Sequence, residues 1–315
     1  MSKVGLQLSN FSLGVPDAEL FERFAALATS AEEAGVDSVW VMDHFFQLPM
    51  LGGPDQPILE AYTLLGALAA RTRRVQLGTL VTGVTYRNPA LLAKMVTTLD
   101  VISGGRAICG IGAAWFDVEH VAMGFDFPPA GERLDRLEEA VQICRAMFDG
   151  DHTSFTGRHY RTADVRNVPA PVQARLPILI GGGGEKRTLR LVAQHADAGN
   201  VGGDEAAVAH KIGVLRAHCA DVGRDPAEIS VTRMSPTFRT TSADETRQTR
   251  EFLAAQAGEE ALAGFDIGTD DEILSRLARL AAAGVDEFIL ILPFATPTDL
   301  AALAPFVAEV HALGR

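Results

Sequence analysis

Asp43 and His44 are adjacent, and they follow an apolar run, Ser38 to Met42, that is typical of a strand. A histidine can give or take a proton near neutral pH, and a neighbouring carboxylate can orient its ring. The alternative interpretation is a helix-capping aspartate beside a surface histidine. The pair is the first candidate for proton transfer, with His44 as the catalytic group.

Four consecutive glycines, Gly181 to Gly184, precede Glu185, Lys186 and Arg187. Glycines between a strand and a helix leave backbone N–H groups free at the helix N-terminus, where a phosphate binds well. Lys186 and Arg187 add positive charge. The segment lacks the Walker spacing of a P-loop. It predicts an anion site, with a flexible turn as the alternative.

Other candidates also follow predicted strands. The segment Gly78–Gly83 includes Thr79, Leu80 and Thr82. Its glycines permit a bulge, and its threonine hydroxyls can bind a polar ring. Gly110 and Gly112 only partly match a dinucleotide fingerprint, because the third glycine is missing. Asn200 is expected at the edge of the same cleft. Plain strand structure is the alternative at all these positions.

Alternating strands and helices must position these groups. The predicted strands are residues 4–8, 38–42, 75–81, 107–111, 177–180, 198–201, 229–234 and 287–292. The predicted helices are residues 18–34, 59–71, 89–101, 131–148, 185–195, 204–222, 243–262, 270–283 and 297–313. Eight strands followed by helices favour an α/β fold, the (β/α)8 TIM barrel, over an open doubly wound sheet. The active site of a barrel lies at the C-terminal ends of its strands, where all the candidates fall.

Two long segments, at about residues 113–130 and 151–176, interrupt the alternation of strands and helices. Long loops in a compact domain are usually lids or binding loops. No linker separates the two halves of the 315-residue chain, so residues 1–315 are predicted to form a single barrel domain with inserted loops.

The formal net charge of −12 argues against nucleic-acid or anionic-membrane partners, which need a basic face. No apolar run is long enough for a membrane span, and no signal peptide is evident. Three scattered cysteines form no disulfide framework, so we expect a cytoplasmic protein. The histidines are also scattered, so no metal site is expected.

Five segments, in this order, resemble the luciferase-like monooxygenase superfamily and, within it, the coenzyme F420-dependent oxidoreductases. They are VWVMDHF at 39–45, LGTLVTGVTYRNPALLAK at 77–94, SGGRAICGIGAAW at 103–115, GFDFPPAGERLDRLEEA at 124–140 and PILIGGGGEKRTLRLVAQHADAGN at 177–200. The resemblance spans nearly the whole chain.

The resemblance implies a flavin or deazaflavin bound at the strand C-termini. Asp43 and His44 would lie beside its ring, and His44 near the reacting edge. Thr79 and Leu80 would form a bulge under the ring, often with a non-proline cis peptide, and Thr82 would contact the ring or its side chain. The residues that would hold the rest of the cofactor, its phosphate included, are Gly112, Gly182, Gly183, Gly184, Glu185 and Asn200.

The chain departs from the sugar-phosphate dehydrogenases of this branch at two positions. Leu48 stands near the place of their tryptophan, and Ala113 stands where they carry a glutamate. Sugar-phosphate oxidation is therefore not the expected reaction, and His44 remains as the proton donor.

Three functions stay open. The first is hydride transfer between coenzyme F420 and a small organic molecule. The second is an FMN-dependent monooxygenase, and the third is a non-catalytic flavin-binding barrel. A deazaflavin carries an acidic tail, for which rim residues Arg87, Arg161, Arg166, Lys186 and Arg187 are candidates. Relatives suggest a homodimer.

Overall fold

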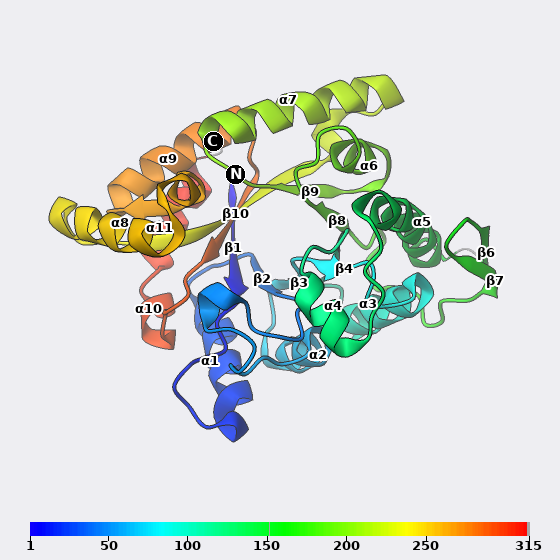
Figure 1. Cartoon of the computed structure of the whole chain (residues 1–315), viewed down its shortest axis with the longest axis horizontal. Helices are drawn as coiled ribbons and strands as arrows, with labels where there is room; N and C mark the ends of the chain where they lie inside the picture. The colour runs from blue at the N-terminus through cyan, green and yellow to red at the C-terminus, as the bar shows by residue number, and fades with distance from the viewer. Residues whose placement is uncertain (151, 314–315) are drawn as a thin grey trace.

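The centre of the molecule is a closed barrel of parallel strands (Figure 1). The computed structural model describes residues 1–150 and 152–313, and eight strands in these ranges follow one another around the barrel. They are β1 (Lys3–Leu8), β2 (Ser38–Val41), β3 (Gln76–Thr79), β5 (Ala107–Gly112), β8 (Ile178–Gly181), β9 (Ala198–Val201), β10 (Ser230–Arg239) and β12 (Glu287–Ile291). Because β10 pairs with both β9 and β12, and β12 pairs with β1, the circle closes. The predicted TIM barrel is confirmed.

The inside of the barrel is filled by large apolar side chains. Trp40, Leu80, Ile108, Leu179 and Ile289 come from five parts of the sheet and pack into one buried cluster. Strands that are buried on both faces need apolar residues throughout, which explains their almost continuous hydrophobic sequence.

At the N-terminal end of the barrel interior, the Trp40 Nε1–H donates to Ser38 Oγ at 2.6 Å, and Ser38 donates to the Glu287 carboxyl group. Burial raises the pKa of Glu287.

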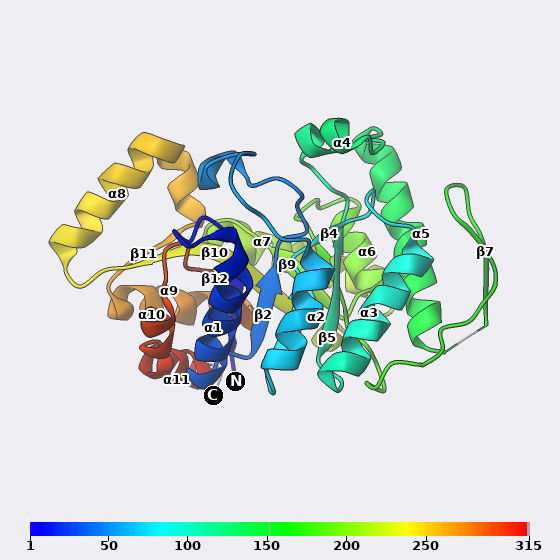
Figure 2. The same cartoon turned by 90° about the horizontal axis from the view of Figure 1, so that it is seen from below.

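Helices surround the barrel (Figures 1 and 2). They are α1 (Leu20–Glu33), α2 (Ala61–Arg71), α3 (Pro89–Ser103), α5 (Ala130–Phe148), α6 (Thr188–His195), α7 (Glu205–Val222), α8 (Ala243–Ala257), α9 (Asp270–Ala283), α10 (Pro297–Ala301) and α11 (Ala304–Ala312). All of them except α8, which buries no residue, contribute apolar side chains to the core outside the strands. Short 3-10 turns occur at Asp17–Glu19, Pro49–Leu51, Pro226–Glu228 and Glu259–Gly264. Local sequence fixes several ends: Asn88 caps α3 ahead of Pro89, and Thr269 and Glu272 form a capping box at α9.

The predicted third strand is interrupted. Residues 75–81 were predicted as one strand, with a bulge at Thr79 and Leu80 implied by the family resemblance. Strand β3 ends at Thr79, the Leu80–Val81 peptide is cis, and β4 (Thr82–Gly83) resumes beside β5, so the bulge with its non-proline cis peptide is confirmed. Neighbouring strands make room for this bulge by carrying glycine. A Cβ on Gly110 would lie 1.8 Å from the Thr79 carbonyl oxygen, and a Cβ on Gly112 would lie 2.7 Å from Val81 Cγ2.

Both predicted insertions contain secondary structure. The first carries α4 (Asp117–Met123), which lies at the C-terminal face of the barrel (Figure 2). The second carries a hairpin of β6 (Thr153–Thr156) and β7 (Arg161–Val165), which the sequence did not predict. Its turn is anchored because the Glu139 carboxylate accepts backbone hydrogen bonds from Arg158, His159 and Tyr160. Three residues lie outside the described ranges. They are Asp151, the first residue of the second predicted insertion, and Gly314 and Arg315, the last two residues of the predicted domain.

Three boundaries near the C-terminus also differ. The helix expected at 243–262 ends at Ala257 and is followed by a 3-10 turn, and the helix expected at 297–313 divides into α10 and α11. Strand β10 extends beyond the predicted residue 234, because β11 (Asp266–Gly268) pairs with its last residues.

Within the described residues, no helix combines the length and apolar character needed to cross a bilayer.

Candidate active site

A histidine and a carboxylate meet at the C-terminal face of the barrel. His44 follows β2, and Glu119 comes from α4, yet His44 Nδ1 lies 2.7 Å from Glu119 Oε1. The side chain of His44 is 14% exposed and that of Glu119 is fully buried. A carboxylate at this position favours the tautomer that carries its proton on Nδ1 and leaves Nε2 free to exchange a proton.

Glu119 is held by more than His44. Its Oε2 accepts the Phe45 N–H at 2.8 Å, and its Oε1 accepts the Tyr86 hydroxyl. Burial by itself raises the pKa of Glu119, but the hydrogen bonds from His44, Tyr86 and Phe45 outweigh burial, so the pKa is lowered. Burial and the Glu119 carboxylate raise the pKa of Tyr86. Glu119 is therefore an ionised group that fixes the orientation of the His44 ring.

Aromatic side chains enclose the other side of His44. The rings of Trp115 and Phe116 meet it edge-on, with centroid distances of 5.7 and 5.8 Å. Phe116 is buried, whereas Trp115 is 60% exposed. His44 thus lies against a partly open apolar surface.

Asp43, the neighbour of His44, is held in a buried ion pair. It is 2% exposed, and its carboxylate accepts hydrogen bonds from Arg87 at 2.6 and 3.0 Å. Arg87 also donates to Glu60 at 2.6 Å and lies 4.9 Å from the centre of the Tyr62 ring. Burial raises the pKa of Asp43, and Arg87 opposes that rise. The structure therefore places Asp43 in a buried ion pair, and places Arg87 in the interior instead of on the rim.

Threonine hydroxyls support the bulge from inside. Thr79 Oγ1 lies 2.9 Å from Thr82 Oγ1 and donates to the Gly110 carbonyl at 2.9 Å. Thr82 Oγ1 also lies 2.8 Å from the Tyr62 hydroxyl. Both threonines are fully buried and Leu80 is 8% exposed, so their side chains are engaged within the protein. The expected contact between Thr82 and a ring stays a prediction.

The glycine-rich loop joins β8 to α6. Gly182 adopts a positive φ of 125°, which favours glycine, and its N–H donates to the Asn200 carbonyl at 3.3 Å. The N–H groups of Gly183 and Gly184 have no acceptor among the described residues. Glu185 is held against α7, since its carboxylate lies 3.2 Å from His210 Nε2. The loop thus presents free donors and is braced by a helix.

Lys211 of α7 covers this loop. A Cβ added to Gly183 would lie 2.3 Å from Lys211 Nζ, so the ammonium group packs directly against the backbone of Gly183. No ion-pair partner for Lys211 is found in the part of the chain that the structure describes. A cation beside free N–H groups is well suited to a phosphate.

The predicted basic rim is only partly present. Arg187 pairs with Asp135 at 2.5 Å, and Arg166 pairs with Asp164 at 3.2 Å beside the outlying β6–β7 hairpin. Arg161 lies on that hairpin, away from the barrel mouth (Figure 1). Lys186 is exposed in the glycine-rich loop.

The structure brings His44, the bulge and the glycine-rich loop to one end of the barrel. Sequence reasoning missed Glu119 and Lys211, which lie on helices outside every quoted motif, and Tyr86, which lies within the segment 77–94 but was given no role. In the described ranges, no group of three or more histidine, cysteine, aspartate or glutamate side chains gathers as metal ligands do.

Fold and site together define a (β/α)8 barrel with an imidazole–carboxylate pair and a phosphate-suited loop at its C-terminal face. The sequence profile of the luciferase-like monooxygenase family matches residues 3–302, and the chain belongs to that family.

Curated relatives include F420-dependent glucose-6-phosphate dehydrogenases from several organisms. The protein from Amycolatopsis mediterranei (strain U-32) is 36% identical over 185 residues, which are 58% of this chain and 53% of the relative. The protein from Kineococcus radiotolerans is 38% identical over 163 residues, which are 51% of this chain and 47% of the relative. The chain thus spans about half the length of the curated relatives it matches.

Solved structures share the fold over nearly the full length. An F420-dependent secondary alcohol dehydrogenase superposes with a TM-score of 0.80 at 19% identity, covering 98% of this chain and 99% of that one. A coenzyme F420-dependent tetrahydromethanopterin reductase from Methanopyrus kandleri has a TM-score of 0.78 at 18% identity, covering 98% of each chain. A long-chain alkane monooxygenase has a TM-score of 0.80 at 15% identity, covering 99% of this chain and 92% of that one.

Proposed function

We propose that the protein is an oxidoreductase that uses the deazaflavin coenzyme F420 for hydride transfer to or from a small organic molecule. The observation that carries this proposal is the His44–Glu119 pair at the same barrel end as the glycine-rich loop and Lys211. Relatives at 36–38% identity that are named F420-dependent support the choice of cofactor.

The residues fit a planar, phosphate-bearing cofactor. The free N–H groups of Gly183 and Gly184 and the ammonium group of Lys211 would hold its phosphate. The bulge at Leu80 and Val81 would support its ring, beside His44. When bound, a deazaflavin supplies or accepts a hydride and reacts poorly with oxygen.

His44 would handle the proton. In the reducing direction, the substrate carbon gains a hydride and the neighbouring heteroatom takes a proton from Nε2. In the oxidising direction, Nε2 removes the proton from a hydroxyl group as the hydride leaves the carbon. Glu119 stabilises the imidazolium and holds the ring, so that Nε2 points toward the substrate.

One experiment distinguishes the proposed function from the two alternative functions. Purified protein would be titrated with F420 and, separately, with FMN, and binding would be followed by fluorescence. Tight F420 binding with weak FMN binding is expected. Preference for FMN, together with oxygen uptake that requires reduced FMN, would replace the proposal with a monooxygenase. F420 binding without turnover of any reducible or oxidisable compound would leave a non-catalytic flavin-binding barrel.

A further inference from the structure

Apolar side chains line one side of the barrel mouth. Met42, Leu48 and Phe116 form a buried cluster, with Leu51 and Ile58 packed against it. Trp115 lies next to Phe116, with 5.2 Å between ring centroids, and also contacts His44. We call this surface the Trp115 wall, and define it by Met42, Leu48, Leu51, Trp115 and Phe116.

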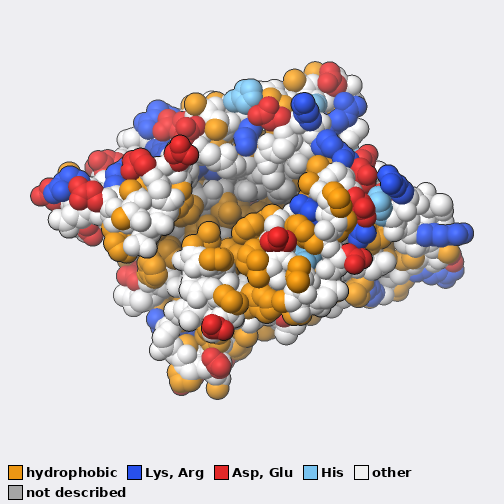
Figure 3. All heavy atoms as spheres, in the orientation of Figure 1, with side chains coloured by type: hydrophobic (Ala, Val, Ile, Leu, Met, Phe, Trp, Pro, Cys, Tyr) orange, Lys and Arg blue, Asp and Glu red, His pale blue; other side chains and the backbone are white. Residues whose placement is uncertain are grey.

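The wall continues onto α4. Val118, Val121 and Met123 are 54%, 79% and 47% exposed, although an ordinary surface helix of this length would carry polar groups there. Figure 3 shows the hollow at the C-terminal face and the hydrophobic side chains gathered along the side formed by α4 and the loop after β2. Contiguous exposed apolar surface beside a reactive group marks a binding site.

The charges around the wall exclude a strongly anionic ligand. The two segments that build it, residues 44–60 and 113–132, contain no lysine or arginine. They carry the exposed acidic residues Asp55, Asp117 and Asp126 instead. The next cation along the chain, Arg133, is engaged within this segment: it donates to the carbonyl groups of Ala113 and Pro128, and its guanidinium group lies 4.0 Å from the centre of the Phe127 ring. A phosphate on this side would meet several like charges, which costs binding energy.

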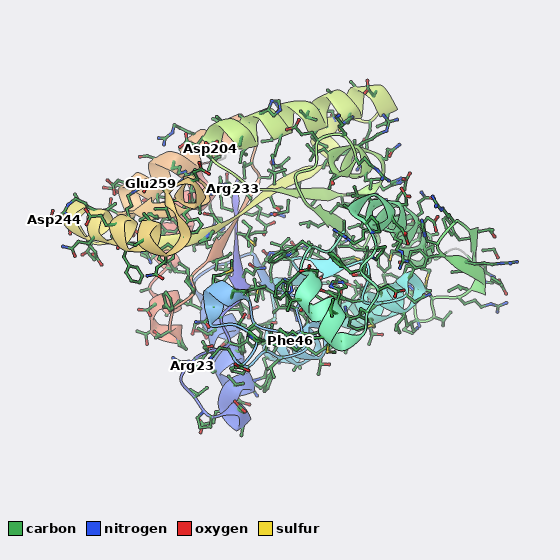
Figure 4. All side chains as sticks on the ribbon, in the orientation of Figure 1. Arg23, Phe46, Asp204, Arg233, Asp244 and Glu259 are labelled. Carbon is green, nitrogen blue, oxygen red and sulfur yellow. The ribbon has the colours of Figure 1, made fainter. Side chains whose placement is uncertain are left out.

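The arginines of β10 do not supply the missing cation. Arg233 is 1% exposed and its Nη1 lies 2.8 Å from Asp266 Oδ2, and it lies among the elements near the centre in Figure 4. Arg239 donates two hydrogen bonds of 2.7 Å to Asp270. The free cation described above, Lys211, lies over the glycine-rich loop, where the cofactor phosphate is proposed.

From these observations we infer that the substrate is an uncharged, largely apolar carbonyl compound or alcohol, which lies against the Trp115 wall with its oxygen toward His44. This inference rests on the proposed hydride transfer. The wall gives the apolar body a surface that excludes water, and His44 supplies the polar contact. A sugar phosphate, the substrate named for the curated relatives, does not suit this surface.

Binding of a homologous series of straight-chain methyl ketones tests the inference. Isothermal titration calorimetry on F420-loaded protein should show that each added CH2 group tightens binding about two- to fourfold until the wall is covered. Glucose-6-phosphate should bind more weakly than the longer ketones. Tighter binding of glucose-6-phosphate, or affinity that does not change with chain length, would overturn the inference.

Variants of Trp115 locate the binding surface. Trp115→Ala should weaken binding of the longest ketone about tenfold, and Trp115→Phe should keep most of the affinity. Leu91→Ala removes an apolar side chain of similar exposure, 54%, from the outer helix α3 and should have no effect. Equal weakening by Trp115→Ala and Leu91→Ala, or none by either, would place the substrate elsewhere.

The same samples separate this inference from the proposed function. Failure of F420 to bind would refute the proposed cofactor, and the ketone series would then be measured on the protein alone. Its Trp115 fluorescence reports binding there, because the chain's other tryptophan, Trp40, is fully buried. F420 binding combined with a preference for glucose-6-phosphate would uphold the cofactor and refute the apolar substrate.

Discussion

Nδ1 of His44 lies 2.7 Å from Oε1 of Glu119, although 75 positions of the chain separate the two residues. The carboxylate reaches the imidazole from α4, an insertion that is not part of the repeating barrel. The proposed proton transfer would therefore depend on a helix added to the fold.

Replacing Glu119 with Gln should lower turnover by about tenfold or more, because the imidazolium loses the charge that stabilises it. For the same reason, one limb of the pH profile of kcat should move to lower pH: the acid limb in the oxidising direction, where Nε2 accepts the proton, and the alkaline limb in the reducing direction, where Nε2 donates it. Steady-state kinetics across pH would measure both effects. Asp117→Asn, an exposed carboxyl group on the same helix, is the control and should leave the profile unchanged. A variant with reduced turnover but an unshifted profile would indicate a purely structural role for Glu119.

Replacing His44 with Asn should reduce turnover about 100-fold or more, while F420 affinity changes little, since the proposed phosphate contacts lie elsewhere. Kinetics combined with a fluorescence titration would separate the two quantities. Unchanged turnover would remove His44 from the mechanism.

Lys211→Met should weaken binding of F420 about tenfold or more, because a charge-assisted contact to phosphate is lost. A deazaflavin that lacks the phosphate should bind the variant and the original protein equally. Arg190→Met, an exposed cation on α6, serves as the control. Equal weakening of both ligands would mean that Lys211 acts on the shape of the loop and not on the phosphate.

Glu32 joins the end of α1 to the turn before β3, because its carboxylate accepts the N–H groups of Arg73, Arg74 and Val75. Burial alone raises the pKa of Glu32, but these hydrogen bonds lower it below the ordinary value of 4.5. Glu32→Gln should therefore reduce the free energy of unfolding at neutral pH by about 1 to 3 kcal/mol.

A depressed pKa contributes stability above the unfolded-state value, and that contribution is lost as the pH falls through the folded-state value. The difference between Glu32→Gln and the original protein should thus shrink below pH 4.5. Urea unfolding at several pH values would measure it, and a difference that is constant with pH would contradict the assignment.

Gly110→Ala should destabilise the protein by about 3 kcal/mol or more or prevent folding, because the new Cβ would overlap the Thr79 carbonyl oxygen. Gly213→Ala is the matched control, since it lies inside α7 with no atom within 4 Å of the added Cβ. That change should be neutral or stabilising by about 0.5–1 kcal/mol. Thermal unfolding would compare them, and similar melting temperatures would show that the bulge can move.

The sequence predicted the barrel well because strand composition and helical periodicity are local signals. It also predicted that His44, Thr79 and the glycine-rich loop meet at one end, since strand order alone decides that. It could not predict that Asp43 turns inward, because the partner Arg87 is 44 positions away. Nor could it predict Glu119 or Lys211, whose roles depend on how α4 and α7 pack over the barrel. The glycines of Gly78–Gly83 permitted a bulge, but its place at Thr79 and Leu80 and its cis peptide were predicted only through the family resemblance.

The pairing of β1 with β12 has a consequence for synthesis. Strand β1 is synthesised well before Glu287–Ile291, the segment that covers one of its edges. Until then the nascent chain holds an unfinished sheet with an open edge, which is prone to pair with other chains. Efficient production of this protein is expected to depend on chaperones or on a pace of translation that limits the lifetime of that edge.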